Sequence, residues 1–160
     1  RGEKFNSKDI RYEKIIIMTD ADVDGAHIST LLMSFFYKEF PKLIDEGHLY
    51  LSVPPLFKIS KGSKILYAVD DKHRDQIIKS EFKGGEVMIN RFKGLGEMMP
   101  AQLKETTMSP ENRTLLKVQI APKDKNKTKK SVEALMGKRP ELRFKFIIDN
   151  SKSISAENIL

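Results

Sequence analysis

The sequence predicts an α/β fold in which a parallel sheet is flanked by helices, with a short, mostly helical extension at the carboxyl end. The first observation is a run of four apolar residues at positions 15–18, bounded by Lys14 and by acids, which is typical of a buried parallel strand. The second is that strand, loop and helix recur in that order further along the chain. The third is an apolar stripe at helical spacing, which we expect to pack in the core: Ile28, Leu31, Leu32, Phe35, Phe36 and Phe40.

The other elements follow from turn and breaker residues. A short helix at residues 41–46 starts with Pro41 and stops at Gly47, and a strand at 48–53 stops at Pro54 and Pro55. Two strands at 56–60 and 64–69 form a hairpin. The remaining predicted elements are a helix ending near residue 82, a strand at 87–92, a loop at 93–100, a helix at 100–106, a helix start at 109–111, a strand at 115–120, and helices at 131–136 and 141–149.

Composition limits the functional class. The chain has 160 residues and no cysteine, which rules out disulfides and thiolate metal sites. No apolar run approaches the roughly 20 residues that span a bilayer, so we expect a soluble cytoplasmic protein with no membrane partner. The 29 Lys and Arg against 22 Asp and Glu leave a net charge of +7. A basic body around an acidic pocket suits a phosphodiester polymer, and a merely basic, soluble surface is the alternative.

The acidic pocket is predicted where the apolar run ends. Asp20, Asp22 and Asp24 are spaced two apart at the carboxyl end of the first strand, which is the edge where open α/β sheets bind ligands. Alternate residues of an extended segment point the same way, so Asp20 and Asp22 can face a common point. Two hard oxygen ligands on one side suit Mg²⁺.

Three other interpretations compete with metal binding. Asp24 can be the N-cap of the helix that begins near Ala26 or His27. An EF-hand is rejected because its twelfth position, which needs a bidentate Glu, is Leu31. A solvated acidic turn with no ligand would leave the repulsion between three carboxylates uncompensated, so we rank it below metal binding.

Three motifs in a fixed order carry a family resemblance: Thr-Asp-Ala-Asp-Val-Asp-Gly-Ala-His at 19–27, Val-Pro-Pro-Leu-Phe-Lys at 53–58 and Arg-Phe-Lys-Gly-Leu-Gly-Glu-Met at 91–98. With them, residues 12–150 resemble the B subunits of bacterial type IIA topoisomerases. The resemblance implies a Toprim-type, Rossmann-like fold. It also implies that a first strand carrying a further metal-binding Glu, and the domain that binds ATP, lie upstream of Arg1. A start that is polar and lacks Met is consistent with a cut inside a longer protein.

The resemblance implies a role for the site residues. Asp20 and Asp22 would hold Mg²⁺, with Asp24 as an indirect or alternate ligand. His27, Lys93, Arg91 and Arg143 would contact double-stranded DNA. The DNA would be cut by a tyrosine of a partner A subunit in a heterotetramer, so this chain alone is expected to be inactive. The Gly-x-Gly at 94–96 lacks the pattern of a nucleotide loop, and we do not predict an ATP site there.

Within the family, the absence of a large insertion before residue 91 and the string Met-Gly-Lys at 136–138 favour the topoisomerase IV branch, whose partner is the topoisomerase IV A subunit, over gyrase. A Toprim nuclease or primase, and a non-catalytic DNA-binding or docking module, are the alternatives. The predicted organisation is a polar segment at residues 1–11, a Toprim domain at 12–121, a basic linker at 122–130 and a helical tail at 131–160.

Overall fold

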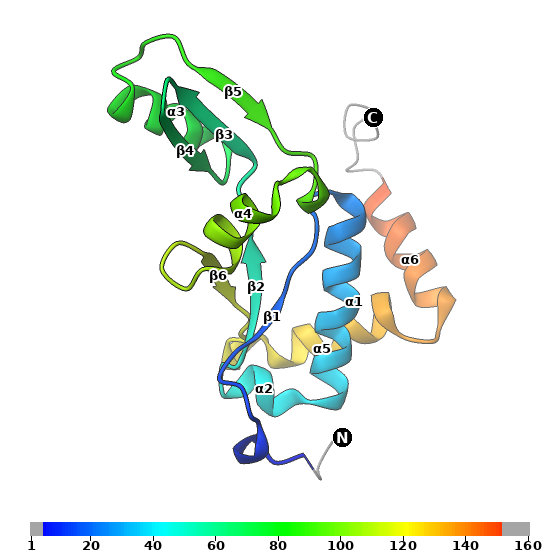
Figure 1. Ribbon diagram of the computed structural model, residues 1–160. Helices are drawn as coiled ribbons and strands as arrows, with labels where there is room; N and C mark the ends of the chain where they lie inside the picture. The colour runs from blue at the N-terminus through cyan, green and yellow to red at the C-terminus, as the bar shows by residue number, and fades with distance from the viewer. Residues whose placement is uncertain (1–4, 152–160) are drawn as a thin grey trace. The chain divides into compact units, whose positions relative to one another are not determined.

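The computed structural model describes residues 5–151 and divides the chain into two compact units, Arg1–Val118 and Gln119–Leu160 (Figure 1). The first unit holds the described strands and helices α1 to α4, and the second holds α5 and α6. The predicted α/β class with a helical carboxyl-terminal part is confirmed. The last part of the predicted tail, residues 152–160, lies outside the described residues. None of the helices in the described part of the chain is long and apolar enough to cross a membrane.

One sheet of the first unit carries the apolar run. Strand β1 (Ile15–Ile17) pairs in parallel with β2 (Leu49–Val53), and β2 pairs antiparallel with β6 (Thr114–Lys117). The crossover from β1 to β2 runs through α1 (Val23–Glu39) and α2 (Pro41–Asp45). Among the described pairings only β1 with β2 is parallel, so the predicted parallel sheet is reduced to one parallel pair. The carboxyl ends of these two strands therefore meet at one edge.

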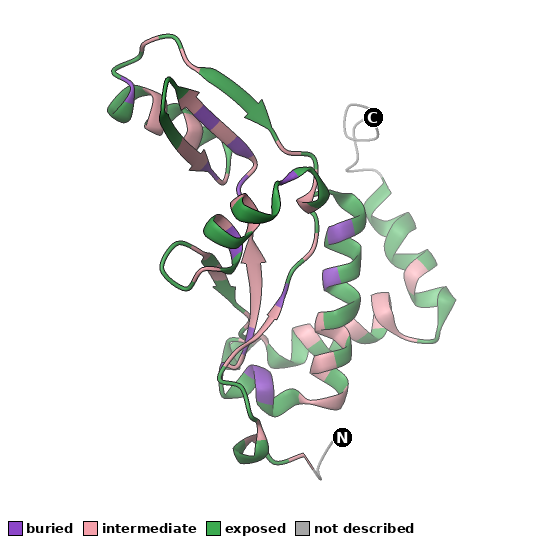
Figure 2. Ribbon diagram, in the orientation of Figure 1, coloured by how far each residue is buried: buried purple, intermediate pink, exposed green. Residues whose placement is uncertain are grey.

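The second sheet has β3 (Phe57–Lys61) between β4 (Lys64–Ala68) and β5 (Met88–Arg91), and both pairings are antiparallel. Helix α3 (Asp71–Glu81) covers this sheet, and the Asp70 carboxylate caps it by accepting the His73 N–H at 2.7 Å. A core forms between helix and sheet (Figure 2). Its buried members are Phe57, Ile59, Ala68 and Phe82. Buried Pro55 lies on the segment that leads from β2 into β3.

Two sequence predictions differ from the structure in secondary structure. Residues 110–112 form a turn, where a helix was predicted to start at residues 109–111. Before this turn, α4 (Pro100–Leu103) continues as a wider π-type turn, Lys104–Met108. Helix α5 (Lys125–Met136) includes residues 125–130, which were predicted as linker, and α6 spans Pro140–Ser151. Lysine is a good helix former, so a basic run can be helical although it has no apolar face. The predicted domain boundaries remain predictions.

The prediction that the α1 stripe is core is wrong for the described structure. Ile28, Leu31 and Phe35 are each about half exposed, at 50%, 48% and 47%, and the buried residues of α1 are Gly25 and Ser29 (Figure 2). Strand β1 has three residues and thus a length of about 10 Å, whereas a helix of 17 residues is about 25 Å long. So short a strand cannot cover the whole apolar face of the helix.

The second sheet allows a direct test of its core. Ile59 on β3 is fully buried. Ile89, which is paired with Ile59 on the neighbouring strand β5, is 45% exposed. We expect Ile59→Ala to lower the free energy of unfolding by about 2–5 kcal/mol because it leaves a cavity. Ile89→Ala is the matched control and should cost less than about 1 kcal/mol. Urea unfolding followed by circular dichroism measures both, and equal losses would contradict this description of the core.

Candidate functional site

The acidic motif follows β1 at the sheet edge where β1 and β2 both end. Asp20 and Asp22 lie on the wall of a cavity of about 350 Å³, as the sequence pattern predicted. The polar side chains of this wall come from both strand ends and from α1: Thr19, Asp20, Asp22, Ser29 and Ser52. The Ser52 hydroxyl is buried and has no hydrogen-bond partner among the described residues.

The N-cap of α1 is Asp22 and not Asp24, so the capping prediction is corrected. The Asp22 Oδ1 accepts the Gly25 N–H at 2.7 Å, and α1 begins at Val23, earlier than expected. Asp24 lies in the first helical turn and is exposed. The two assignments could not be separated in the sequence because each of these acids precedes an apolar or small residue near the helix start. Asp22 therefore combines a structural contact with its predicted metal role.

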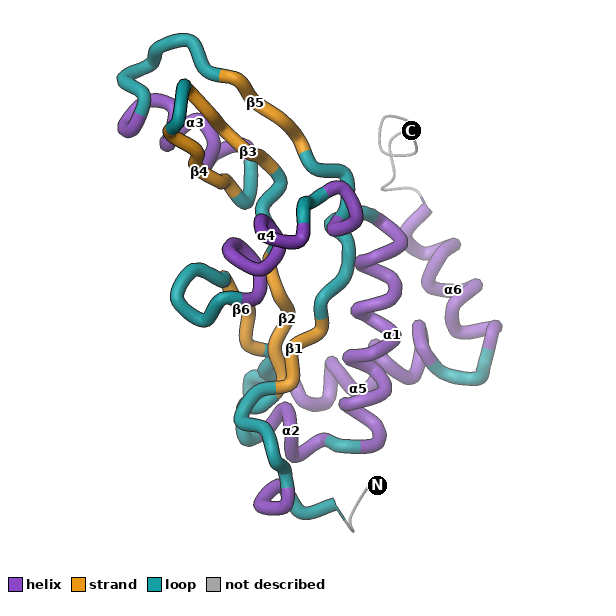
Figure 3. Tube along the Cα trace, in the orientation of Figure 1, coloured by secondary structure: helices purple, strands orange, loops and turns teal. Residues whose placement is uncertain are grey.

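Asp20 is crowded from two directions. A Cβ at Gly25 would lie 2.0 Å from the Asp20 carbonyl oxygen, so the first turn of α1 can approach the end of β1 only with glycine there. On its side-chain face, Asp20 Oδ1 accepts the Leu95 N–H at 2.7 Å. Figure 3 shows the loop after β5 reaching the loop between β1 and α1. The structure thus brings residues 93–97 to the acidic motif, a contact that no local sequence signal reveals.

The ligand chemistry fits a hard divalent cation. The Asp20 and Asp22 carboxylates each accept a hydrogen bond from a backbone N–H, and a carboxylate has about four acceptor positions. Each side chain is exposed and keeps capacity for a cation. In the part of the chain that the structure describes, no three His, Cys, Asp or Glu side chains gather as a metal cluster. Mg²⁺ is compatible with so small a set because it often keeps several waters and takes one or two carboxylates.

The predicted DNA-contacting residues lie on different elements. His27 is exposed early in α1, and Lys93 is exposed in the loop that reaches Asp20. Arg91 ends β5, with its guanidinium 5.7 Å from the centre of the Phe57 ring. Arg143 belongs to the second unit, where its Nη1 donates to the Gly137 carbonyl at 2.6 Å. Arg91 and Arg143 therefore have structural contacts of their own, whatever else they bind.

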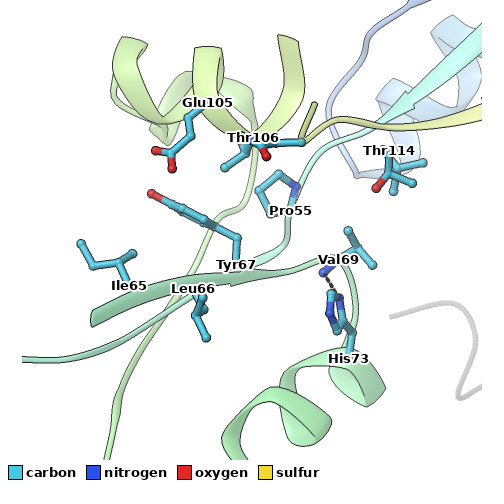
Figure 4. A pocket seen from close by; sticks show the side chains of 11 residues that line it. Pro55, Ile65, Leu66, Tyr67, Val69, His73, Glu105, Thr106 and Thr114 are labelled. Carbon is cyan, nitrogen blue, oxygen red and sulfur yellow. Dashed lines mark hydrogen bonds between the residues drawn. The ribbon is translucent and has the colours of Figure 1, made fainter. Parts of the chain in front are cut away.

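A second cavity, of about 280 Å³, was not predicted (Figure 4). Strand β4 and the Pro55 segment supply apolar walls, and the Val69 N–H donates to His73 Nδ1 at 3.4 Å. Glu105 and Thr106 face Tyr67 from the π-type turn (Figure 4). Glu105 is the one carboxylate among the described residues of its wall. The acidic cavity has the more suitable ligands for a metal, so we place the candidate site there.

Comparison with known families agrees with the motifs. Residues 3–54 match the model of the Toprim domain, and residues 84–148 match that of the DNA gyrase B subunit, carboxyl terminus. The chain is 58% identical to the DNA topoisomerase 4 B subunit of Bartonella bacilliformis over 92% of the chain, and 53% identical to that of Caulobacter vibrioides over 98%. It is 47% identical to the DNA gyrase B subunit of Clostridium acetobutylicum over 96%. The chain spans 22–24% of the length of these relatives.

The capping contact gives a prediction about stability alone. Asp22→Ala should lower the free energy of unfolding by about 1 kcal/mol because the Gly25 N–H loses its acceptor. Asp22→Asn should stay within a few tenths of a kcal/mol, since Asn caps about as well as Asp. Asp24→Ala serves as the control and should change little. Thermal unfolding of the three variants decides between the two acids, and a loss confined to Asp24→Ala would contradict the assignment of the cap.

Proposed function

We propose that this chain, which is related over nearly its whole length to a region of bacterial type IIA topoisomerase B subunits, is the metal- and DNA-binding Toprim part of a type II DNA topoisomerase. The observation that carries the proposal is the position of Asp20 and Asp22. They lie on the wall of a cavity, in the segment that joins the parallel strand β1 to α1, and their motif falls within the region matched by the Toprim model. The carboxyl edge of a parallel pair is a general ligand-binding position.

In this proposal Asp20 and Asp22 hold Mg²⁺, and Asp24 contributes through water or as an alternate ligand. When bound, the cation supplies Lewis-acid stabilisation of a reacting phosphate and its leaving oxygen. The Asp20 carboxylate is held by a hydrogen bond from the Leu95 N–H. The Asp22 carboxylate is held by a hydrogen bond from the Gly25 N–H of α1. The chain therefore contributes placed carboxylates, and the nucleophile is a tyrosine of a partner A subunit.

DNA contact is assigned to four basic or polar residues. His27, Lys93 and Arg91 belong to the first unit, and Arg143 belongs to the second. The net charge of +7 supports attraction to a polyanion. We place the assembled enzyme, an ATP-dependent heterotetramer that includes two copies of the partner, in the bacterial cytoplasm, where its DNA substrate lies.

The topoisomerase IV branch is favoured over gyrase. The 58% and 53% identical relatives carry the topoisomerase 4 name, and the gyrase relative is 47% identical. The partner is then the topoisomerase IV A subunit. A second candidate is a non-catalytic DNA-binding or docking module. It is favoured by the lack of a cluster of three metal-binding side chains among residues 5–151, and it predicts equal DNA binding with and without Mg²⁺.

Amide variants separate ligation from folding. In the full-length protein assembled with its partner, Asp20→Asn and Asp22→Asn should each lower Mg²⁺-dependent DNA cleavage by at least about 100-fold, because even residues that only support a metal ligand are worth about 10–100-fold. Asp22→Asn keeps the helix cap, so its loss of cleavage should come without loss of stability. Normal cleavage by both variants at saturating Mg²⁺ would refute the ligand assignment.

DNA binding should depend steeply on salt. If Lys93 meets a phosphate, Lys93→Ala should reduce the slope of log affinity against log salt by about 1. Lys72→Ala, which removes an exposed lysine from α3, is the matched control and should leave the slope unchanged. Fluorescence anisotropy with duplex DNA at several salt concentrations measures both slopes. Equal slopes for the wild type and Lys93→Ala would remove Lys93 from the DNA contact.

A further inference from the structure

We propose that the loop at residues 93–97 is a positioning device for the Asp20 carboxylate, with Glu97 as the residue that holds the loop in shape. The inference rests on the proposed function, because it assigns a purpose to the loop only if Asp20 binds a cation. Three independent contacts carry it: a hydrogen bond to Asp20, a steric fit against Asp20, and a hydrogen bond that closes the loop on itself.

The hydrogen bond links distant parts of the chain. The Leu95 N–H donates to Asp20 Oδ1 at 2.7 Å, across a separation of 75 residues. A bond between a backbone N–H and a carboxylate is charge-assisted and stronger than a neutral one. It fixes one oxygen of Asp20 and leaves Oδ2 and the remaining lone pair for a cation. Asp20 is exposed, so without this bond its side chain would be free to change rotamer.

The steric fit explains Gly94. Its backbone has φ −164°, an extended conformation that any residue adopts, so glycine is not required by the dihedral angle. A Cβ at this position would instead lie 3.0 Å from Asp20 Cγ and 3.1 Å from both carboxylate oxygens. At Gly96, two residues further on, an added Cβ meets nothing within 4 Å. A methyl group at Gly94 would therefore push the Asp20 carboxylate aside by a few tenths of an ångström, whereas a methyl group at Gly96 would not touch it.

Glu97 closes the loop through the loop's own backbone. Its Oε2 accepts the Lys93 N–H at 2.7 Å, and its own N–H donates to the Gly94 carbonyl at 3.2 Å. The Met98 N–H donates to the Leu95 carbonyl at 3.2 Å, and Met98 is buried, with 7% of its surface exposed. The turn that aims the Leu95 N–H is therefore held at both ends, and Glu97 acts through the backbone and not as a ligand.

The matched pair Gly94→Ala and Gly96→Ala tests the inference. Mn²⁺ is titrated into each chain and the free ion is followed by electron paramagnetic resonance. Gly94→Ala should weaken binding by at least about tenfold, the range for groups that support a metal ligand. Gly96→Ala, the same substitution in the same loop, should bind as the wild type does. Equal affinity of Gly94→Ala and the wild type would overturn the proposal.

Glu97 is tested by a conservative rescue. Glu97→Ala should weaken Mn²⁺ binding, and Glu97→Gln should restore it, because the amide oxygen of Gln can still accept the Lys93 N–H. A true ligand would behave differently, since replacing its charge by an amide would lose affinity. Equal losses in Glu97→Gln and Glu97→Ala would overturn the assignment of Glu97 as a positioning residue.

A readout without metal separates this inference from the proposed function. Amide hydrogen exchange at Leu95 should be about tenfold or more faster in Asp20→Ala than in the wild type, as expected for loss of one hydrogen bond to a charged group. Adding Gly94→Ala to Asp20→Ala should change exchange no further, because the added methyl then has no carboxylate to displace. If the Leu95 amide of the wild type is protected from exchange but the protein binds no Mn²⁺, the proposed function is contradicted. If the Leu95 amide of the wild type is not protected from exchange, the inference is overturned.

Discussion

The crowding around Asp20 is the constraint on which this structure depends. Two glycines from distant parts of the sequence converge on this one residue: Gly25 against its backbone and Gly94 against its carboxylate. The first allows α1 to start directly at the end of β1, and the second allows a loop from the other sheet to reach the side chain. Because the contacts are so close, the helix start, strand end and loop have little freedom to move independently.

The two sheets contribute different things to the site. The parallel pair β1 and β2 sets the edge at which Asp20, Asp22 and Ser52 face one cavity. The antiparallel sheet supplies the loop: the Phe92 N–H donates to the Leu56 carbonyl at 2.8 Å, so the chain enters residues 93–97 from a point tied to the start of β3. The core that includes Phe57 and Ile59 therefore stabilises the antiparallel sheet, and the loop that follows this sheet carries the Leu95 N–H.

The sequence predicted those features that repeat locally, and it missed those that depend on contacts between distant residues. The β1 run, the hairpin of β3 and β4, and the position of the acids at a strand end follow from periodicity and turn residues. Asp22 is the N-cap of α1, although residue type alone allows either Asp22 or Asp24 to cap the helix. The exposure of the α1 stripe does not follow from the sequence, because amphipathicity shows which face of a helix is apolar and not what covers that face. The bond from Leu95 to Asp20 has no local signal.

The central claim is that Asp20 and Asp22 hold a divalent cation at the carboxyl end of β1. The most direct measurement is a crystal structure of this chain grown with Mn²⁺, with anomalous diffraction recorded at the manganese edge. We expect an anomalous peak about 2–2.2 Å from carboxylate oxygens of Asp20 and Asp22, with the Leu95 N–H still bonded to Asp20. A structure with both side chains well ordered and the manganese bound elsewhere, or not at all, would contradict that claim.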